Sequence, residues 1–149
     1  MAREIVVLNR IHAEEFDCPY DWACISIANT ERDFAVIPVD NRIGLLQLAF
    51  ADITQDIPGY QLFHDDHAHD ILDFVTHNWD HVVTLMIHCD AGISRSSAVA
   101  AAIARLKWQD ESEFLEPPFE PNPIVYRTIR EVATGRGDYQ EEDDHWEDD

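Results

Sequence analysis

Residues 88–96 contain a cysteine and an arginine at a spacing that suits phosphate chemistry. The segment reads HCDAGISRS, with five residues between Cys89 and Arg95. It follows an apolar run at 82–87, which predicts a buried strand, and precedes a long apolar run at 96–107, which predicts a buried helix. A turn between a strand and a helix can direct its backbone N–H groups inward at the positive end of the helix. We therefore expect this loop to bind a phosphate or sulfate dianion.

Three residues give this loop its expected chemistry. Gly92 can adopt backbone angles that a side chain would forbid. Arg95 offers a planar pair of N–H groups that match two phosphate oxygens, which a lysine cannot do. Cys89 is then expected at the bottom of the loop, where the amides, the helix dipole and Arg95 all favour its thiolate. This arrangement predicts a cysteine nucleophile that attacks phosphorus.

The segment that contains Cys89 and Arg95, together with three other segments, resembles a known family. HCDAGISRS resembles the His-Cys-x5-Arg-Ser/Thr signature of the cysteine-dependent protein tyrosine phosphatases, and specifically of their small dual-specificity branch. LLQLAFADI at 45–53 looks like the strand that leads into the general-acid loop of that branch. HAHDILDFV at 67–75 looks like the following helix, and PNPIVYRTI at 121–129 like a segment near the end of the domain. The similarity extends over residues 45–132.

The resemblance implies a single α/β domain with a mixed, largely parallel central sheet flanked by helices, no metal cofactor, and a two-step reaction through a phosphocysteine. It assigns Cys89 as the nucleophile and Ser96 as the hydroxyl that helps the phosphocysteine break down. His88 is implied to support the loop and tune the cysteine. The phosphate is implied to be held by the loop residues Asp90, Ala91, Gly92, Ile93, Ser94 and Arg95.

The reaction also requires a carboxylic acid on a separate loop, which protonates the leaving alcohol and then activates water. Asp52, in the sequence FADI after an apolar strand, matches the position of this residue in the family. Asp56 lies four residues later in the same loop and is the alternative. We therefore expect a protein phosphatase that acts on phosphotyrosine, and also on phosphoserine or phosphothreonine if the dual specificity of the branch applies.

The elements that position these residues are predicted from apolar patterns. Strands are expected at 5–8, 24–28, 35–39, 45–50 and 82–87. Helices are expected after the acidic turn at Asp65 and Asp66, over 96–107, and from Asn122 as N-cap to a stop at Gly135. The Pro-rich segment 110–123 reads as a loop. Residues 1–137 thus form one catalytic domain, and 138–149, with eight acidic residues in twelve, predict a disordered tail.

The charge of the chain limits its partners. Ten Lys and Arg residues against thirty Asp and Glu residues give a formal net charge of −20. This field repels phosphate backbones and anionic lipid headgroups, so binding to nucleic acid or a membrane is not expected. No apolar run approaches the roughly 18 residues of a membrane span. We expect a cytoplasmic protein whose partner is a phosphoprotein or phosphopeptide substrate.

Asp90, directly after the nucleophile, adds a negative charge to the loop. With only one arginine present, a polyanionic phosphoinositide headgroup is disfavoured. Alternatively, the Asp90 carboxylate points to solvent or pairs with a neighbouring cation, and then carries no information about substrate.

Other interpretations of the sequence remain open. His64 and His67, with Asp65 or Asp70, have spacing that zinc or iron would accept, although an acidic helix start explains them more simply. A pseudophosphatase that captures phosphorylated partners is a non-enzymatic alternative. An RNA 5′-triphosphatase shares the loop chemistry, but the acidic charge disfavours it. Cys18 and Cys24 are candidate resolving partners for an oxidised Cys89.

Overall fold

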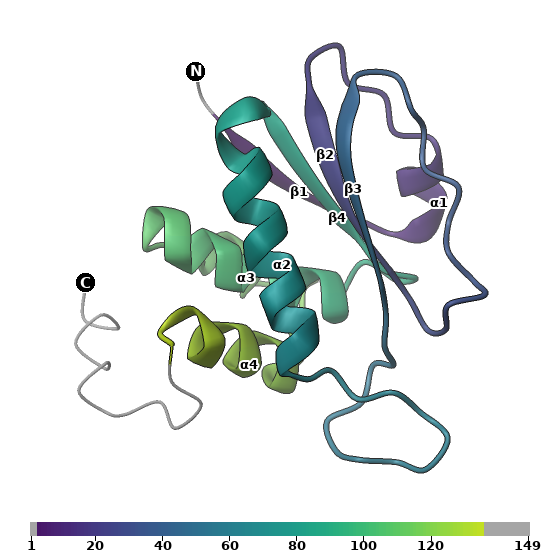
Figure 1. Cartoon of the computed structure of the whole chain (residues 1–149), viewed down its shortest axis with the longest axis vertical. Coiled ribbons are helices and arrows are strands. Elements are labelled where there is room, and N and C mark those ends of the chain that lie inside the picture. Colours follow the sequence, from purple (N-terminus) through teal and green to yellow (C-terminus); the bar gives the residue numbers. More distant parts are fainter. Residues whose placement is uncertain (1–2, 136–149) are drawn as a thin grey trace.

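The protein is described here by a computed structural model covering residues 3–135. Its centre is a four-stranded sheet with strand order β1-β4-β2-β3, in which all neighbouring strands are parallel (Figure 1). The strands are β1 (Glu4–Leu8), β2 (Trp22–Ala28), β3 (Arg42–Ala49) and β4 (Thr84–His88). The predicted single α/β domain is confirmed, and the sheet, predicted as mixed and largely parallel, contains only parallel strand pairs within residues 3–135. The predicted tail at 138–149 lies outside the described residues.

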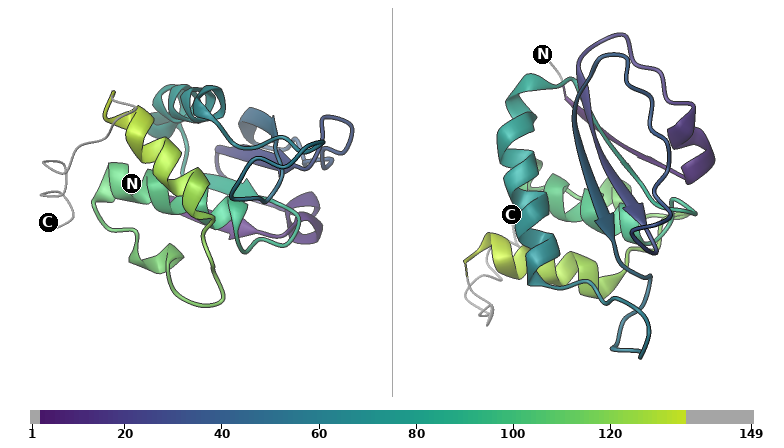
Figure 2. Two further views of the ribbon diagram at one scale, coloured as in Figure 1. Left: turned by 90° about the horizontal axis from the view of Figure 1, so that it is seen from below. Right: turned by 45° about the vertical axis from the view of Figure 1, so that its right-hand side comes forward.

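Helices cover both faces of the sheet. Helices α2 (Asp65–Asn78), α3 (Arg95–Trp108) and α4 (Pro123–Ala133) lie on one face, and the short α1 (Arg10–Glu14) lies on the other (Figure 2). Two 3₁₀ turns, η1 (Trp79–His81) and η2 (Ser112–Phe114), complete the set. The sequence did not predict α1, η1 or η2, because elements of three to five residues are too short to show a helical period. Within residues 3–135, no helix is both long and apolar enough to cross a membrane.

Two of the three predicted helices, α2 and α4, begin with side-chain caps. The Asn122 carboxamide oxygen accepts hydrogen bonds from the backbone N–H groups of Ile124 and Val125, at 2.9 and 3.2 Å. At the start of α2, His64 Nδ1 accepts from the N–H of Asp66, and His67 Nδ1 accepts from the N–H of His64. These bonds satisfy N–H groups that have no partner within the helix.

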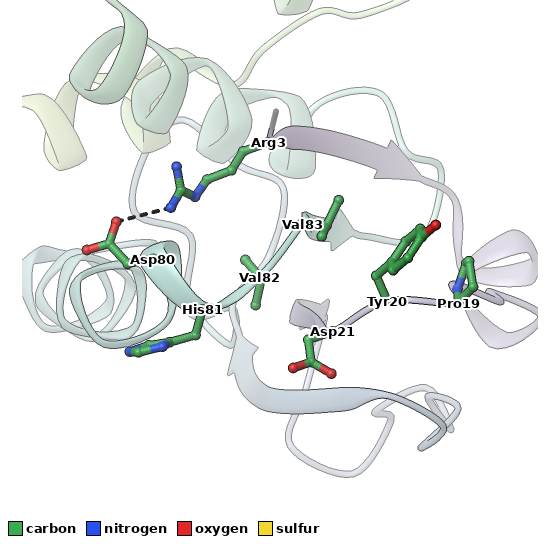
Figure 3. Close-up of a pocket in the computed structure, with 8 residues that line it drawn as sticks. All are labelled: Arg3, Pro19, Tyr20, Asp21, Asp80, His81, Val82 and Val83. Carbon is green, nitrogen blue, oxygen red and sulfur yellow. Dashed lines mark hydrogen bonds and ion pairs between the residues drawn. The ribbon is translucent and has the colours of Figure 1, made fainter. Parts of the chain in front are cut away.

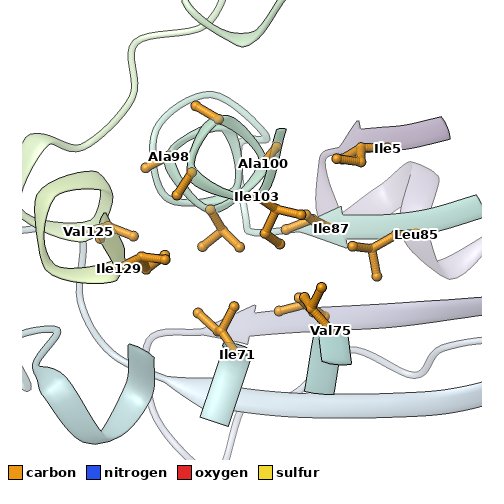
Figure 4. Close-up of a cluster of buried hydrophobic side chains, with 14 of the residues drawn as sticks. Ile5, Ile71, Val75, Leu85, Ile87, Ala98, Ala100, Ile103, Val125 and Ile129 are labelled. Carbon is orange, nitrogen blue, oxygen red and sulfur yellow. The ribbon is translucent and has the colours of Figure 1, made fainter. Parts of the chain in front are cut away.

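The larger core packs α3 against the sheet and against its neighbouring helices (Figure 4). Ile103 of α3, Ile87 of β4 and Ile129 of α4 are each at most 1 % exposed. Burying such a side chain fully stabilises the fold by about 1.5–3 kcal/mol. Because α3 is buried on nearly all sides, its first residue, Arg95, is fixed at the carboxyl end of β4.

The predicted strand at 35–39 is wrong. This segment has no regular secondary structure and pairs with no strand of the sheet. Its polar groups are satisfied by side chains instead: the N–H of Val36 donates to the Glu14 carboxylate at 3.2 Å, and Arg42 donates to the carbonyl of Ile37 at 2.9 Å. Ala35 and Ile37 are buried in the smaller core on the α1 side of the sheet. The segment therefore has the apolar pattern of a strand because it covers a core.

Candidate active site

The predicted phosphate-binding loop connects the carboxyl end of β4 to the start of α3 (Figure 1). Cys89 and Arg95 at its two ends are buried, whereas the side chains of Asp90, Ala91 and Ile93 are exposed. In a parallel sheet with helices on its faces, loops at the carboxyl ends of the strands gather at one edge. The loops that follow β2 and β3 lie at this same edge, and both contribute contacts to the site.

The Cys89 sulfur has two polar neighbours. Its Sγ lies 3.1 Å from Ser96 Oγ and accepts a hydrogen bond from the N–H of Gly92 at 3.3 Å. The side chains of Cys89 and Ser96 are almost completely shielded, at 2 % and 0 % exposure. The Gly92 N–H donates to the sulfur, and in the contact with Ser96 either the hydroxyl or the thiol is the donor. The structure thus brings the predicted nucleophile and the predicted hydroxyl into contact.

Gly92 is required at its position for two reasons. Its φ of +71° lies in the left-handed region. A Cβ atom there would also approach the backbone nitrogen of Asn9 to 2.7 Å and the carbonyl carbon of Leu8 to 2.8 Å. The backbone at the end of β1 therefore packs directly against Gly92 and leaves no room for a side chain there.

Arg95 is clamped through one of its nitrogens. Its Nη1 donates to the Asn29 carboxamide oxygen and to the carbonyl of Phe50, both at 2.8 Å. Its Nε is buried and has no hydrogen-bond partner among the described residues. The edge formed by Nε and Nη2 is the pair of donors that binds two oxygens of a phosphate. The clamp therefore fixes the guanidinium; on its other edge Nε has no hydrogen-bond partner among the described residues, and Nη2 lies 3.9 Å from Asp90 Oδ2.

Asn29 is a site residue that the sequence analysis missed. It follows β2 directly, and its amide also donates to Asp90 Oδ2 at 3.3 Å. Its position in the sequence could have identified it, because a polar residue that immediately follows a buried strand of a parallel sheet lies at the edge where ligand-binding sites form.

Of the two candidate acids, the structure brings only Asp52 to the loop. Asp52 Oδ1 accepts hydrogen bonds from Ser94 Oγ and from the Asn122 amide, both at 2.9 Å. Asp56 is exposed and has no hydrogen bond or ion pair with another residue in the part of the chain that the structure describes. Asn122 was predicted only as a helix cap. Its second contact, with a residue 70 positions earlier, has no sequence signal.

His88 is buried and contacts the backbone at the start of the phosphate-binding loop. Its Nδ1 lies 3.3 Å from the Cys89 carbonyl oxygen, and its Nε2 lies 2.6 Å from Ser26 Oγ. Because a carbonyl can only accept, we assign the proton to Nδ1, so that Nε2 accepts from the serine hydroxyl. Burial lowers the pKa of His88 below its usual value of 6.5, so the neutral ring is favoured.

A cavity of about 600 Å³ lies between the loops that follow β2 and β3, and two of its lining residues, Asn29 and Asp52, hydrogen-bond to residues of the phosphate-binding loop. Its wall includes Asn29 and Glu31 after β2, and Asp52 and Tyr60 from the loop between β3 and α2. A cavity of this size accommodates a substrate side chain.

Another cavity, of about 410 Å³, lies between the segments that precede β1, β2 and β4, at the opposite end of the sheet (Figure 3). Arg3 and Asp80 form an ion pair of 3.3 Å there. It shares no residue with the candidate site.

The other reactive side chains lie outside the loop. His64 and His67 use their Nδ1 atoms as helix caps, and no group of three His, Cys, Asp or Glu residues within 3–135 is arranged to hold a metal ion. Cys18 and Cys24 belong to the smaller core, whereas Cys89 belongs to the larger one. Burial also raises the pKa of the Cys24 thiol to about 12. The structure therefore places neither cysteine beside Cys89.

Comparison with known proteins identifies the fold. No protein-family model and no curated protein sequence matches the chain. Among solved structures, the human tyrosine phosphatase-like serine/threonine/tyrosine-interacting protein is similar, with a TM-score of 0.61, 19 % identity, and coverage of 89 % of this chain and 97 % of the other.

Two further structures are similar over most of their lengths. PTPMT1, in a complex with PI(5)P, gives a TM-score of 0.56 at 14 % identity and covers 89 % of this chain and 91 % of its own. Tk-PTP, in its active form, has a TM-score of 0.56 at 14 % identity, and the match covers 91 % of this chain and 94 % of the other. The predicted resemblance to small dual-specificity phosphatases is confirmed at the level of the fold.

Proposed function

We propose that the protein is a phosphatase that hydrolyses phosphotyrosine, and also phosphoserine and phosphothreonine, through a phosphocysteine on Cys89. The observation that carries this proposal is the state of Arg95. Its Nη1 is held by Asn29 and Phe50, while its buried Nε has no partner among the described residues. An unpaired buried N–H group beside a cysteine at a helix N-terminus is suited to a phosphate oxygen.

In the first step, the Cys89 thiolate attacks phosphorus and the bond from phosphorus to the leaving oxygen breaks. Asp52, as the carboxylic acid, gives its proton to that oxygen and releases the alcohol. The N–H groups of residues 90–95 and the Nε and Nη2 atoms of Arg95 hold the phosphoryl oxygens. The hydrogen bonds from Ser94 and Asn122 to Asp52 support its assignment, because they hold the carboxylate at the rim of the loop.

In the second step, the Asp52 carboxylate takes a proton from water, and the water oxygen attacks the phosphorus of the phosphocysteine. The sulfur–phosphorus bond breaks, inorganic phosphate leaves, and the thiolate is restored. Ser96 Oγ, 3.1 Å from the sulfur, can donate a hydrogen bond to the departing thiolate. The cycle consumes one water and needs no metal ion.

Two other functions use the same loop. A capture module would bind a phosphorylated partner without hydrolysis, and the similarity to an interacting protein favours testing it. A lipid phosphatase would act on a phosphoinositide, and PTPMT1 has been crystallised with PI(5)P. We favour a protein substrate because Asp90 adds a negative charge to the loop, whose only cationic side chain is Arg95.

The proposal is tested by hydrolysis of an aryl phosphate with vanadate as competitor. We expect activity in the wild type and in Cys24→Ala, a buried cysteine of the other core, and none in Cys89→Ser. Activity should persist after a chelator is added. Activity in Cys89→Ser, or loss of activity on chelation, contradicts the cysteine mechanism. Binding of phosphopeptide without any turnover indicates the capture module, and faster turnover of PI(5)P than of phosphopeptide indicates the lipid phosphatase.

A further inference from the structure

Asp90, the residue directly after the nucleophile, lies against the arginine that is expected to bind phosphate. Its Oδ2 is 3.9 Å from Arg95 Nη2 and accepts a hydrogen bond from the Asn29 amide at 3.3 Å. Its Oδ1 is 4.0 Å from Arg10 Nη1. Of the two alternatives expected for this carboxylate, pairing with a neighbouring cation is the one observed, and one of the two cations is the arginine that is expected to bind phosphate.

Arg10 does not neutralise Asp90 by itself. The Arg10 guanidinium also lies 3.5 Å from the Glu14 carboxylate and 3.4 Å from that of Asp33. Three carboxylates therefore share two guanidiniums, those of Arg10 and Arg95, before any phosphate is bound. Part of the charge of Arg95 is offset by Asp90 in the free protein.

We propose that Asp90 is a specificity-determining residue, which selects substrates with one phosphate over substrates with a second phosphate beside the first. This inference rests on the proposed function. The first phosphate gains hydrogen bonds from the loop amides and from Nε and Nη2 of Arg95, and these offset its repulsion by Asp90. A second phosphate has no such partners in the loop and meets the half-exposed Asp90 carboxylate, whose side chain is 42 % exposed.

The test compares two phosphotyrosine peptides of one sequence, with and without a non-hydrolysable phosphonate analogue of phosphoserine next to the phosphotyrosine. We measure kcat/KM for both in the wild type, in Asp90→Asn and in Asp33→Asn. Asp33 is the matched control, because it also pairs with Arg10 and carries the same charge but has no ion pair with Arg95. We expect Asp90→Asn to reduce the preference for the singly phosphorylated peptide about three- to tenfold, mainly through KM, and Asp33→Asn to leave it unchanged.

High salt should shrink the difference between the wild type and Asp90→Asn, because screening weakens the repulsion. An unchanged preference in Asp90→Asn, or an equal change in Asp33→Asn, overturns the proposal, since the second result would reflect overall charge alone. If Asp90→Asn does not fold, Asp90→Ser serves in its place. A wild type that hydrolyses neither peptide refutes the proposed function, and the role of Asp90 with it. An active wild type with an unchanged preference in Asp90→Asn refutes only the role of Asp90.

Discussion

Asp52 Oδ1 accepts a 2.9 Å hydrogen bond from Ser94 Oγ, which joins the loop after β3 to the phosphate-binding loop. The two residues are 42 positions apart in sequence. Ser94 immediately precedes Arg95, so the carboxylate lies beside the residue that is expected to hold the phosphate. This contact separates Asp52 from Asp56, which the sequence alone left as alternatives.

Replacing Asp52 tests its assignment as the general acid. We expect Asp52→Asn to lower kcat about 10²- to 10⁴-fold for substrates whose alcohol is a poor leaving group, because no group then protonates the leaving oxygen. Asp56→Asn is the control and should retain wild-type activity. A pH–rate profile should lose the limb that depends on the carboxyl group in Asp52→Asn. A variant that keeps both limbs of the wild-type profile would exclude Asp52.

Asn122 has two functions that one substitution can separate. Its oxygen caps α4, and its amide donates to Asp52 and to the carbonyl of Ile53. Serine is also a good N-cap but cannot make the amide contact. We expect Asn122→Ser to keep nearly all of the stability and to lower kcat about tenfold, whereas Asn122→Ala should also lose about 1 kcal/mol of stability. Equal activity in Asn122→Ser and the wild type would show that Asp52 does not need this contact.

Gly92 is compared with a second glycine that has a similar backbone angle. Both Gly92 and Gly59 have positive φ, at +71° and +88°. A Cβ at Gly59 meets nothing within 4 Å, whereas a Cβ at Gly92 collides with the backbone of Leu8 and Asn9. We expect Gly59→Ala to cost about 1–2 kcal/mol in free energy of unfolding, and Gly92→Ala to cost more and to abolish activity. Chemical denaturation checks both values, and an active Gly92→Ala would contradict the observed loop geometry.

His88 predicts the direction in which stability changes with pH. Its pKa in the folded protein is lowered by burial, so the unfolded chain binds a proton more readily. The free energy of unfolding is therefore expected to be highest above the usual pKa of 6.5 and to fall as pH drops below it. Denaturation at pH 7.5 and 5.5 should show a smaller loss in His88→Asn than in the wild type. His69→Asn, which changes an exposed histidine, should behave like the wild type, and an unchanged slope in His88→Asn would refute the prediction.

The sequence predicted the elements with strong local signals. Cys89, Gly92 and Arg95 could be assigned because their spacing is short and the strand and helix around them have continuous apolar runs. Asn122 and Pro123 marked a helix start for the same local reason. The segment 35–39 was incorrectly predicted to be a strand. An apolar pattern indicates that side chains are buried, but it does not distinguish a strand paired in a sheet from a segment packed over a core. The short helix α1 was missed because five residues carry too little periodicity.

The sequence by itself indicated the chemistry expected of the loop: which residue is expected to attack phosphorus, which is expected to bind its oxygens, and which glycine permits the turn. Only the tertiary structure decided which residues hold the loop in place and which carboxylate lies beside its arginine. Asn29 and Phe50 hold Arg95, Asn122 holds Asp52, and Asp90 lies against the arginine. These contacts join residues between 5 and 70 positions apart. They arise because a parallel sheet gathers the ends of its strands at one edge, and side chains that meet there leave no periodic pattern in the chain.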